Sequence, residues 1–187
     1  MKTVIRIGVA AAAALGLMAA APASSAAEHT SARTKQTSTT PATVDIKGVQ
    51  VDEKASSDTR RIIEADAPAA VAAANVCGSG YTISTGAWRH DGYGTTYTWT
   101  DGTSGAGYYD RPICAVFFND SGYTKYMGVR LRSNYTADAP DEDFGAFGSY
   151  AGPVYQKRGY CGTVYSYMEA SNGNVLVDRT QTVGSCN

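Results

Sequence analysis

Nucleophilic catalysis needs a histidine base beside a serine or cysteine nucleophile, and this sequence offers little material for that arrangement. From residue 77 onward it contains one histidine, His90, next to Asp91. The side chains of adjacent residues usually point apart, so the Asp91 carboxylate is not expected to orient the His90 ring. Asp120-Ser121-Gly122 echoes part of a serine-protease nucleophile segment, but without a matching histidine segment a turn is the simpler interpretation. No catalytic residue is therefore predicted.

Carboxylates are the second candidate for chemistry, because Asp138, Asp141, Glu142 and Asp143 gather around Pro140. Calcium prefers such oxygen ligands, and Asp138, Asp141 and Asp143 are the calcium candidates. Their spacing fits no standard calcium loop, so a solvated acidic loop is the favoured interpretation. Glycoside hydrolysis would need two carboxylates facing one cleft, which the sequence does not indicate. No metal or cofactor is expected.

Tyrosine is the more conspicuous residue, since all 13 tyrosines and both tryptophans lie after residue 80. A tyrosine ring has a flat apolar face and a polar tip, which suits both sugar stacking and protein interfaces. The aromatic residues near turns or at outward-facing positions are Tyr93, Tyr97, Trp99, Tyr108 and Tyr109. They are candidates for a face that binds a cell-wall or spore-surface polymer. The alternative is that these rings fill the core and the cross-strand pairs of a sheet.

The first 27 residues have the features of a secretory signal peptide. Lys2 and Arg6 give a positive start, Val9–Ala21 is apolar, and small residues up to Ala27 offer a cleavage site. The apolar run is shorter than the roughly 20 residues that span a bilayer, so a retained anchor helix is less favoured. We predict a secreted, extracellular protein with no membrane span after cleavage at Ala27.

Export changes the interpretation of the four cysteines, Cys77, Cys114, Cys161 and Cys186. In an oxidising compartment four cysteines are expected to form two disulfides, with three pairings open. The sequential pairing, Cys77 with Cys114 and Cys161 with Cys186, closes the shortest loops and is favoured. A four-cysteine zinc site is the alternative, but no Cys-x-x-Cys pair supports it.

Residues 28–76 are predicted to form a low-complexity arm or propeptide. Their first part is rich in serine and threonine, which is typical of disorder. Val44–Ile46 and Val49–Val51 alternate weakly and are candidates for a short pairing. Ser57–Ala73 has helix signals that Pro68 would interrupt. The alternative is an arm that docks on the domain.

Residues 77–187 contain the aromatic side chains needed for a core, arranged in short runs between turn residues such as Asn172-Gly173. We predict an all-β domain, a small sandwich or barrel of about seven short antiparallel strands with two disulfides. The candidate strands are Tyr81–Gly86, Thr95–Thr100, Ile113–Asn119, Tyr126–Arg132, Gly152–Gln156, Gly162–Glu169 and Asn174–Thr180.

The charge balance argues against two classes of partner. This domain contains eight Lys and Arg residues against ten Asp and Glu residues. Nucleic acid binding requires a clustered basic face, and anionic lipid attracts polybasic segments. We therefore expect neither nucleic acid nor a membrane surface as a partner.

Three strings in the domain carry a family resemblance. They are Cys77-Gly78-Ser79-Gly80-Tyr81, Ile113-Cys114-Ala115-Val116 and Ser149-Tyr150-Ala151-Gly152-Pro153-Val154-Tyr155, followed by a cysteine at 161 and another one residue from the end. Together they resemble the spore-associated protein A family of secreted actinobacterial proteins. The resemblance covers about 77–187 and leaves out the arm. It implies secretion and association with the spore or hyphal surface, and it transfers no catalytic residue.

These observations favour a secreted, non-enzymatic surface protein associated with the spore or cell envelope. One alternative is a carbohydrate-binding module that uses exposed tyrosine and tryptophan. The other is a secreted enzyme or enzyme inhibitor without a recognisable motif.

Overall fold

The computed structural model describes residues 41–107 and 109–186 of the chain. The predicted signal peptide, the first part of the predicted arm (28–40) and the candidate ligand residue Tyr108 lie outside the described residues. None of the helices in the described ranges is long and apolar enough to cross a membrane.

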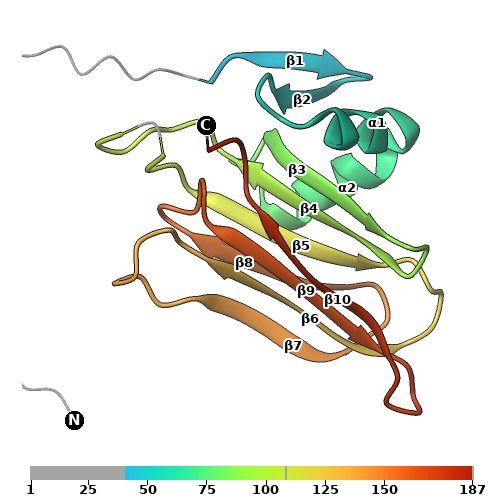
Figure 1. Ribbon diagram of the computed structural model, residues 1–187. Helices are drawn as coiled ribbons and strands as arrows, with labels where there is room; N and C mark the ends of the chain where they lie inside the picture. Colours follow the sequence, from blue (N-terminus) through green and yellow to red (C-terminus); the bar gives the residue numbers. More distant parts are fainter. Residues whose placement is uncertain (1–40, 108, 187) are drawn as a thin grey trace, which may run out of the picture. The chain divides into compact units, whose positions relative to one another are not determined.

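Two β-sheets form the framework of the domain (Figure 1). The six-stranded sheet contains, in spatial order, β1 (Thr43–Ile46), β2 (Val49–Asp52), β3 (Ile83–His90), β4 (Gly94–Thr100), β5 (Ile113–Asn119) and β8 (Tyr150–Gln156). The four-stranded sheet contains β10 (Val175–Thr182), β9 (Thr163–Glu169), β6 (Lys125–Arg132) and β7 (Asp141–Phe147). Neighbouring strands are antiparallel except for β2 and β3, which pair in parallel.

The main core lies between the two sheets. Strand β6 contributes Met127, Val129 and Leu131, all fully buried, and β5 contributes Ile113 and Phe117 from the opposite sheet. Successive side chains of a strand point to opposite faces, so the alternating apolar pattern of β6 places one face in this core. The prediction of an all-β sandwich with two disulfides is confirmed.

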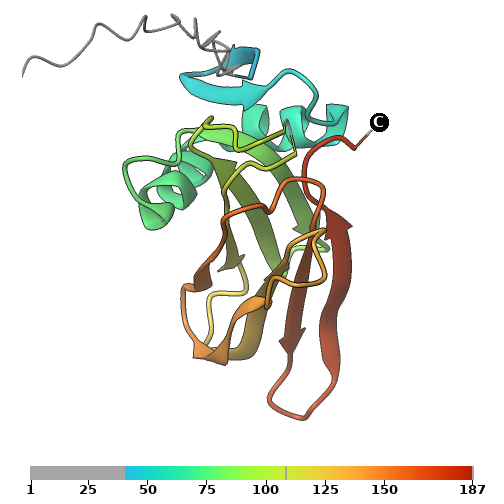
Figure 2. The same cartoon turned by 90° about the vertical axis from the view of Figure 1, so that its left-hand side faces the viewer.

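Two helices cover the other face of the six-stranded sheet (Figures 1 and 2). Helix α1 (Ser57–Ala65) begins where the Ser56 hydroxyl accepts the Thr59 N–H at 3.1 Å. Helix α2 (Ala67–Cys77) begins where Asp66 accepts the Ala69 N–H at 3.2 Å. Pro68 lies in the first turn of α2, where its missing N–H costs nothing. The proline therefore separates the two helices, as the sequence indicated.

The segment 43–76 packs as a part of the domain. Its composition had indicated a low-complexity arm. Strands β1 and β2 form an antiparallel hairpin, in which Ile46 is paired with Val49 and Thr43 with Asp52. Alanines of α2, together with Ile63 of α1 and Val51 of β2, pack against the outer face of β4 and β5 as a second core. Small residues suffice here because the opposite wall supplies the large rings Tyr97 and Trp99.

All seven candidate strands exist, and one strand was missed. Strand β7 carries Asp141, Glu142 and Asp143, which were interpreted as a solvated loop. It pairs with β6 along its whole length, with Glu142 opposite Arg130. A strand at the edge of a sheet tolerates charges that a central strand would exclude, so composition alone does not reveal it.

The disulfides follow the sequential pairing, which is confirmed. Cys77 is bonded to Cys114 and Cys161 to Cys186. The first bridge joins the end of α2 to β5, and the second joins the turn before β9 to the C-terminal segment. Bridges across loops of 37 and 25 residues stabilise the fold by roughly 3–4 kcal/mol each in the loop-entropy account.

A buried ion pair also binds β2 to the β-sandwich. Arg111 and Asp52 are 0 % and 1 % exposed, and the Arg111 Nη1 lies 3.5 Å from the Asp52 Oδ2. The Tyr160 hydroxyl donates to the same carboxylate at 3.3 Å, and its ring lies 5.3 Å from the Arg111 guanidinium carbon. The Ser185 N–H donates to that hydroxyl at 3.1 Å, so one cluster joins β2 to the C-terminal segment.

Replacing Asp52 with alanine tests whether residues 43–76 are integral to the fold. The substitution leaves the Arg111 charge buried without this carboxylate, so we expect the free energy of unfolding to fall by about 3–5 kcal/mol. Urea unfolding followed by tryptophan fluorescence measures the change. The control is Glu53→Ala at the exposed neighbouring position, with an expected change within about 0.5 kcal/mol. Equal stability of the two variants would contradict the prediction.

Candidate functional site

Among the described residues, no helix covers the outer face of the four-stranded sheet. Because Met127, Val129 and Leu131 point into the core, Tyr126, Arg130 and Arg132 point outward from β6. On β9 the buried residues Val164, Ser166 and Met168 alternate in the same way with outward-facing Thr163, Tyr165, Tyr167 and Glu169. Both helices pack on the other sheet, so neither covers this surface (Figure 2).

Four aromatic rings form a continuous row across this surface. Tyr126 contacts Tyr167 edge-on with ring centres 6.4 Å apart, Tyr167 stacks on Tyr165 at 6.4 Å, and Tyr165 neighbours Phe144 at 6.3 Å. Tyr126 is 48 % exposed and the other three rings are half-buried. We call these four residues, together with Arg130, the tyrosine face.

Gly128 is the residue that lets the row lie flat on the sheet. It lies opposite both Phe144 and Tyr167 in the strand register. A Cβ atom at Gly128 would come within 2.1 Å of the Phe144 ring, so any other residue would push that ring outward. The absence of a side chain at this position of β6 therefore allows the Phe144 ring of β7 to lie over it.

Arg130 is held between two of the rings. Its guanidinium carbon lies 5.3 Å from the Phe144 ring centre and 5.6 Å from that of Tyr165. Its Nε forms an ion pair with Glu142 on β7. Stacking and the ion pair together orient this side chain before any ligand arrives.

Carboxylates hold two of the tyrosine hydroxyls of the face. The Tyr167 hydroxyl donates to the Glu169 Oε2 at 2.8 Å, and this bond raises the pKa of Tyr167. Burial, and then a hydrogen bond to Asp178, raise the pKa of Tyr165. Both phenols therefore stay neutral at physiological pH and keep fixed orientations. The surface combines flat rings with fixed donors and acceptors, which is the chemistry of a saccharide-binding platform.

The ligand residues chosen from sequence do not form this face. Tyr97 and Trp99 are each 1 % exposed because the helices cover their side of β4, so assigning them to a ligand surface was wrong. That assignment treated the helical segment as separate from the domain. Tyr93 and Tyr109 are exposed, but they lie at opposite ends of β4.

The signal that marks the tyrosine face is the alternation of β9. Rings at Tyr165 and Tyr167 alternate there with Val164, Ser166 and Met168. This pattern shows that the rings share one face of the strand, but it does not show which strands lie beside them. Their partners on β6 and β7 come from pairings distant in sequence, which no local pattern reveals.

The calcium candidates are used within the fold. The Asp143 Oδ2 accepts the Gly152 N–H and the Asp141 Oδ2 accepts the Tyr155 N–H, both at 2.7 Å, so they fasten β8 to β7. Asp138 pairs with Arg158, whose hydrogen bond lowers the pKa of that carboxyl. The described residues hold no cluster of three His, Cys, Asp or Glu side chains that could bind a metal. In the structure the three carboxylates serve separate contacts and do not converge on one point.

His90 lies inside the sandwich, where it is 6 % exposed. Its Nε2 is 2.9 Å from the Thr96 hydroxyl, which is 2.6 Å from the Ser166 hydroxyl. Ser166 is 2 % exposed, so this chain of polar groups ends in the core. His90 also lines a small pocket of about 200 Å³, together with Asp91 and Arg179. Burial, followed by the positive charge of Arg179, lowers the pKa of His90 to about 4. The histidine is therefore neutral and serves the packing of the core.

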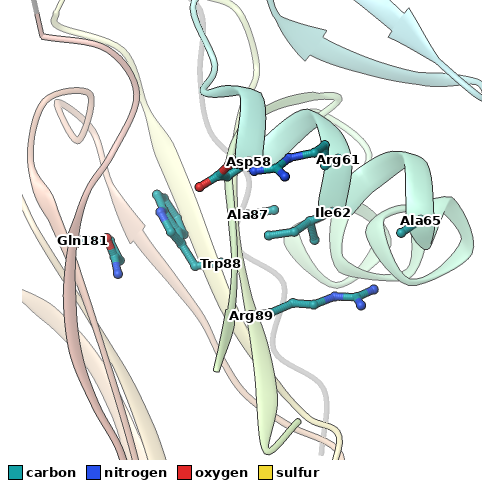
Figure 3. A pocket seen from close by; sticks show the side chains of 8 residues that line it. All are labelled: Asp58, Arg61, Ile62, Ala65, Ala87, Trp88, Arg89 and Gln181. Carbon is teal, nitrogen blue, oxygen red and sulfur yellow. Dashed lines mark hydrogen bonds and ion pairs between the residues drawn. The ribbon is translucent and has the colours of Figure 1, made fainter. Parts of the chain in front are cut away.

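A separate cavity of about 430 Å³ lies beside helix α1, between β3 and β10 (Figure 3). Trp88 stands in it between Gln181 and Asp58, while Ile62 and Ala87 form its apolar wall. Its lining contains a single aromatic ring. The tyrosine face, with four rings in a row, is the stronger candidate for a binding surface.

Comparisons of the chain with protein-family models, with characterised proteins and with solved structures gave no match.

The buried histidine makes stability depend on pH. Its folded-state pKa of about 4 lies below the ordinary value of 6.5, so the unfolded chain binds the proton more readily. This contribution to stability is complete above pH 6.5 and is lost as the pH falls toward 4. Between about pH 7.5 and 4.5 the loss due to His90 should be about 2–3 kcal/mol.

Urea unfolding of the wild type and His90→Gln at several pH values measures this contribution. Glutamine cannot titrate and keeps a hydrogen-bonding group near Thr96. The free energy of unfolding of the variant should therefore fall less than that of the wild type over the same pH range. All other titrations are shared and cancel in the difference. A pH-independent difference between the two proteins would contradict the assigned protonation state.

Proposed function

We propose that this protein is an exported, non-enzymatic surface protein whose tyrosine face binds a polysaccharide of the spore or cell envelope. The observation that carries the proposal is the row of four aromatic rings on an uncovered sheet, with Arg130 held among them. Sugar rings have an apolar C–H face that stacks on such rings and hydroxyls that bind the surrounding carboxylates and guanidinium groups.

The charges around the rings favour a saccharide over a nucleic acid, whose bases would also stack on aromatic side chains. Glu142, Glu169 and Asp178 lie on or beside the tyrosine face. These carboxylates would repel a phosphate backbone, whereas they accept hydrogen bonds from sugar hydroxyls. A polysaccharide satisfies both the rings and the acidic groups.

The proposed location is supported by the two disulfides and by the resemblance to spore-associated protein A. Disulfides persist in oxidising surroundings, which agrees with export behind the Met1–Ala27 segment. The buried position of His90 and the structural use of Asp141 and Asp143 support a binding protein over an enzyme.

Retention on insoluble polymers tests the proposed function. The secreted protein is incubated with chitin, cellulose and peptidoglycan, and bound and free protein are measured over a range of concentrations. We expect saturable binding to at least one polymer, weakened roughly 10-fold by Tyr167→Ala because one stacking ring is lost. The control is Tyr93→Ala, which removes an exposed tyrosine away from the tyrosine face.

Three outcomes would reject the polysaccharide as the occupant of the tyrosine face. The first is no retention on any polymer, and the second is equal weakening by the two tyrosine variants. The third is a dimer in solution that Tyr167→Ala dissociates, because the face would then be occupied by a second copy of the chain.

The mature N-terminus tests the processing that export requires. Since residues 43–76 supply one wall of a core, we expect intact-mass measurement of secreted protein to show a start near Glu28 with both disulfides present. A start between Asn75 and Cys77 would contradict this expectation and show that the segment is a propeptide.

A further inference from the structure

A pocket of about 300 Å³ lies on the six-stranded sheet at the point where helix α2 begins. The strand register builds its floor, because Thr95 of β4 lies opposite Arg89 of β3 on one side and Phe118 of β5 on the other. The lining side chains that carry a charge, a hydroxyl or an aromatic ring are Asp66, Arg89, Thr95, Tyr97, Phe118 and Asp120.

The Tyr97 hydroxyl is the buried polar group of this pocket. Tyr97 is 1 % exposed, and its ring packs in the helix-covered core and contacts Phe118 edge-on, so the ring itself offers no surface for stacking. Burial, and then the charges of Asp66 and Asp120, raise the pKa of Tyr97 to about 12, so the hydroxyl lies near both carboxylates and stays protonated. It makes no hydrogen bond within the described ranges of the chain. A hydroxyl buried in this way is unfavourable until a partner supplies a hydrogen bond.

The two carboxylates of the pocket are fixed in place but only partly used. The Asp66 Oδ1 accepts the Ala69 N–H at 3.2 Å, and the Asp120 Oδ2 accepts the Thr95 hydroxyl at 2.7 Å. The second oxygen of each carboxylate has neither a hydrogen bond nor an ion pair with any residue in 41–107 or 109–186. Two acceptors are therefore oriented before any ligand arrives, which lowers the entropic cost of binding.

The charge of the pocket favours a cation. Two carboxylates outnumber the single guanidinium of Arg89, which is exposed and forms no ion pair with the described carboxylates. An anion at the start of α2 would have to displace Asp66, which already caps that helix. A metal ion is not favoured, because no group of three His, Cys, Asp or Glu side chains gathers among the described residues.

We infer that this pocket binds a small primary amine in its protonated form, held by Asp66, Asp120 and the Tyr97 hydroxyl. An ammonium group has three N–H donors, which match the two unused carboxylate oxygens and the phenol oxygen. The carbon atoms beside the nitrogen can pack on the Phe118 ring. The volume of about 300 Å³ is that of a small-molecule site. The inference does not rest on the tyrosine face, which belongs to the other sheet.

The experiment is a titration of the isotope-labelled secreted protein, followed by two-dimensional amide NMR at about pH 6, where amines are protonated and carboxylates are ionised. Amino sugars and lysine side chains both carry such an ammonium group, so the probes are glucosamine and Nα-acetyl-lysine methylamide. Each is compared with its N-acetylated form, which has no charge. We expect an amine to shift the signals of Ala69, Thr95 and Asp120 and to bind about tenfold more tightly than its neutral form. The probe that binds more tightly identifies the source of the ammonium group.

Asp120→Asn tests the charge of the pocket. Asparagine keeps an oxygen that accepts the Thr95 hydroxyl but removes the negative charge, so the amine should bind about tenfold more weakly. The matched control is Glu53→Gln, which makes the same change in net charge at an exposed position outside the pocket. This control should leave the affinity unchanged.

Tyr97→Phe removes only the hydroxyl. Because that hydroxyl has no hydrogen bond within the described part of the protein, the unfolding midpoint in urea should not fall, whereas the amine should bind several-fold more weakly. A lower midpoint with unchanged affinity would overturn the role assigned to this hydroxyl, because its effect would then be on folding alone.

Three further outcomes would overturn the amine site. The first is equal affinity for the charged and neutral forms in both pairs of probes, and the second is an equal effect of Asp120→Asn and Glu53→Gln. The third is calcium chloride shifting the same signals in the wild type but not in Asp120→Asn, because the pocket would then hold a metal. None of these outcomes affects the proposed function, which is tested by retention on polymers and by Tyr167→Ala.

Discussion

Strand β4 is buried along its whole length, on both faces, and the rest of the structure depends on that constraint. Toward the helices it presents Tyr97 and Trp99, and toward the four-stranded sheet it presents threonines such as Thr96 and Thr98. A strand covered on both sides requires two layers around it. The helices formed by residues 57–77 supply one layer and the four-stranded sheet supplies the other, so the six-stranded sheet retains no open face above β4.

Two kinds of connection keep the helical layer in place. The Cys77–Cys114 disulfide joins the end of α2 to β5, the strand beside β4. The buried pair of Asp52 and Arg111 joins β2 to the loop that leads into β5. Burial of charges is unfavourable unless both partners are present, so the pair ties the folding of the N-terminal segment to that of the sandwich. The segment that looks least like a core in composition thus forms one wall of a core.

The tyrosine face follows from the same arrangement, because both described helices pack on the six-stranded sheet and leave the four-stranded sheet without a helical layer from residues 41–107 and 109–186. Its outward positions are therefore free to carry rings and charges, and they are ordered by their neighbours on the sheet. Gly128 makes room for Phe144, Arg130 lies between Phe144 and Tyr165, and Tyr167 is held by Glu169. Such preorganisation lowers the conformational entropy that a ligand would otherwise have to remove on binding.

The sequence by itself determined every strand except β7, most turns, the break at Pro68 between two helices and the sequential disulfides, because these depend on local periodicity, backbone preference and short loop closure. Only the tertiary structure decided that Tyr97 and Trp99 are buried, that Asp141 and Asp143 bind backbone, and that Tyr126, Tyr165, Tyr167 and Phe144 meet. The physical reason is that alternation along a strand places side chains on one face or the other, but does not specify what covers that face. That depends on pairings such as β6 with β9 and on the docking of α2, which join residues far apart in the chain.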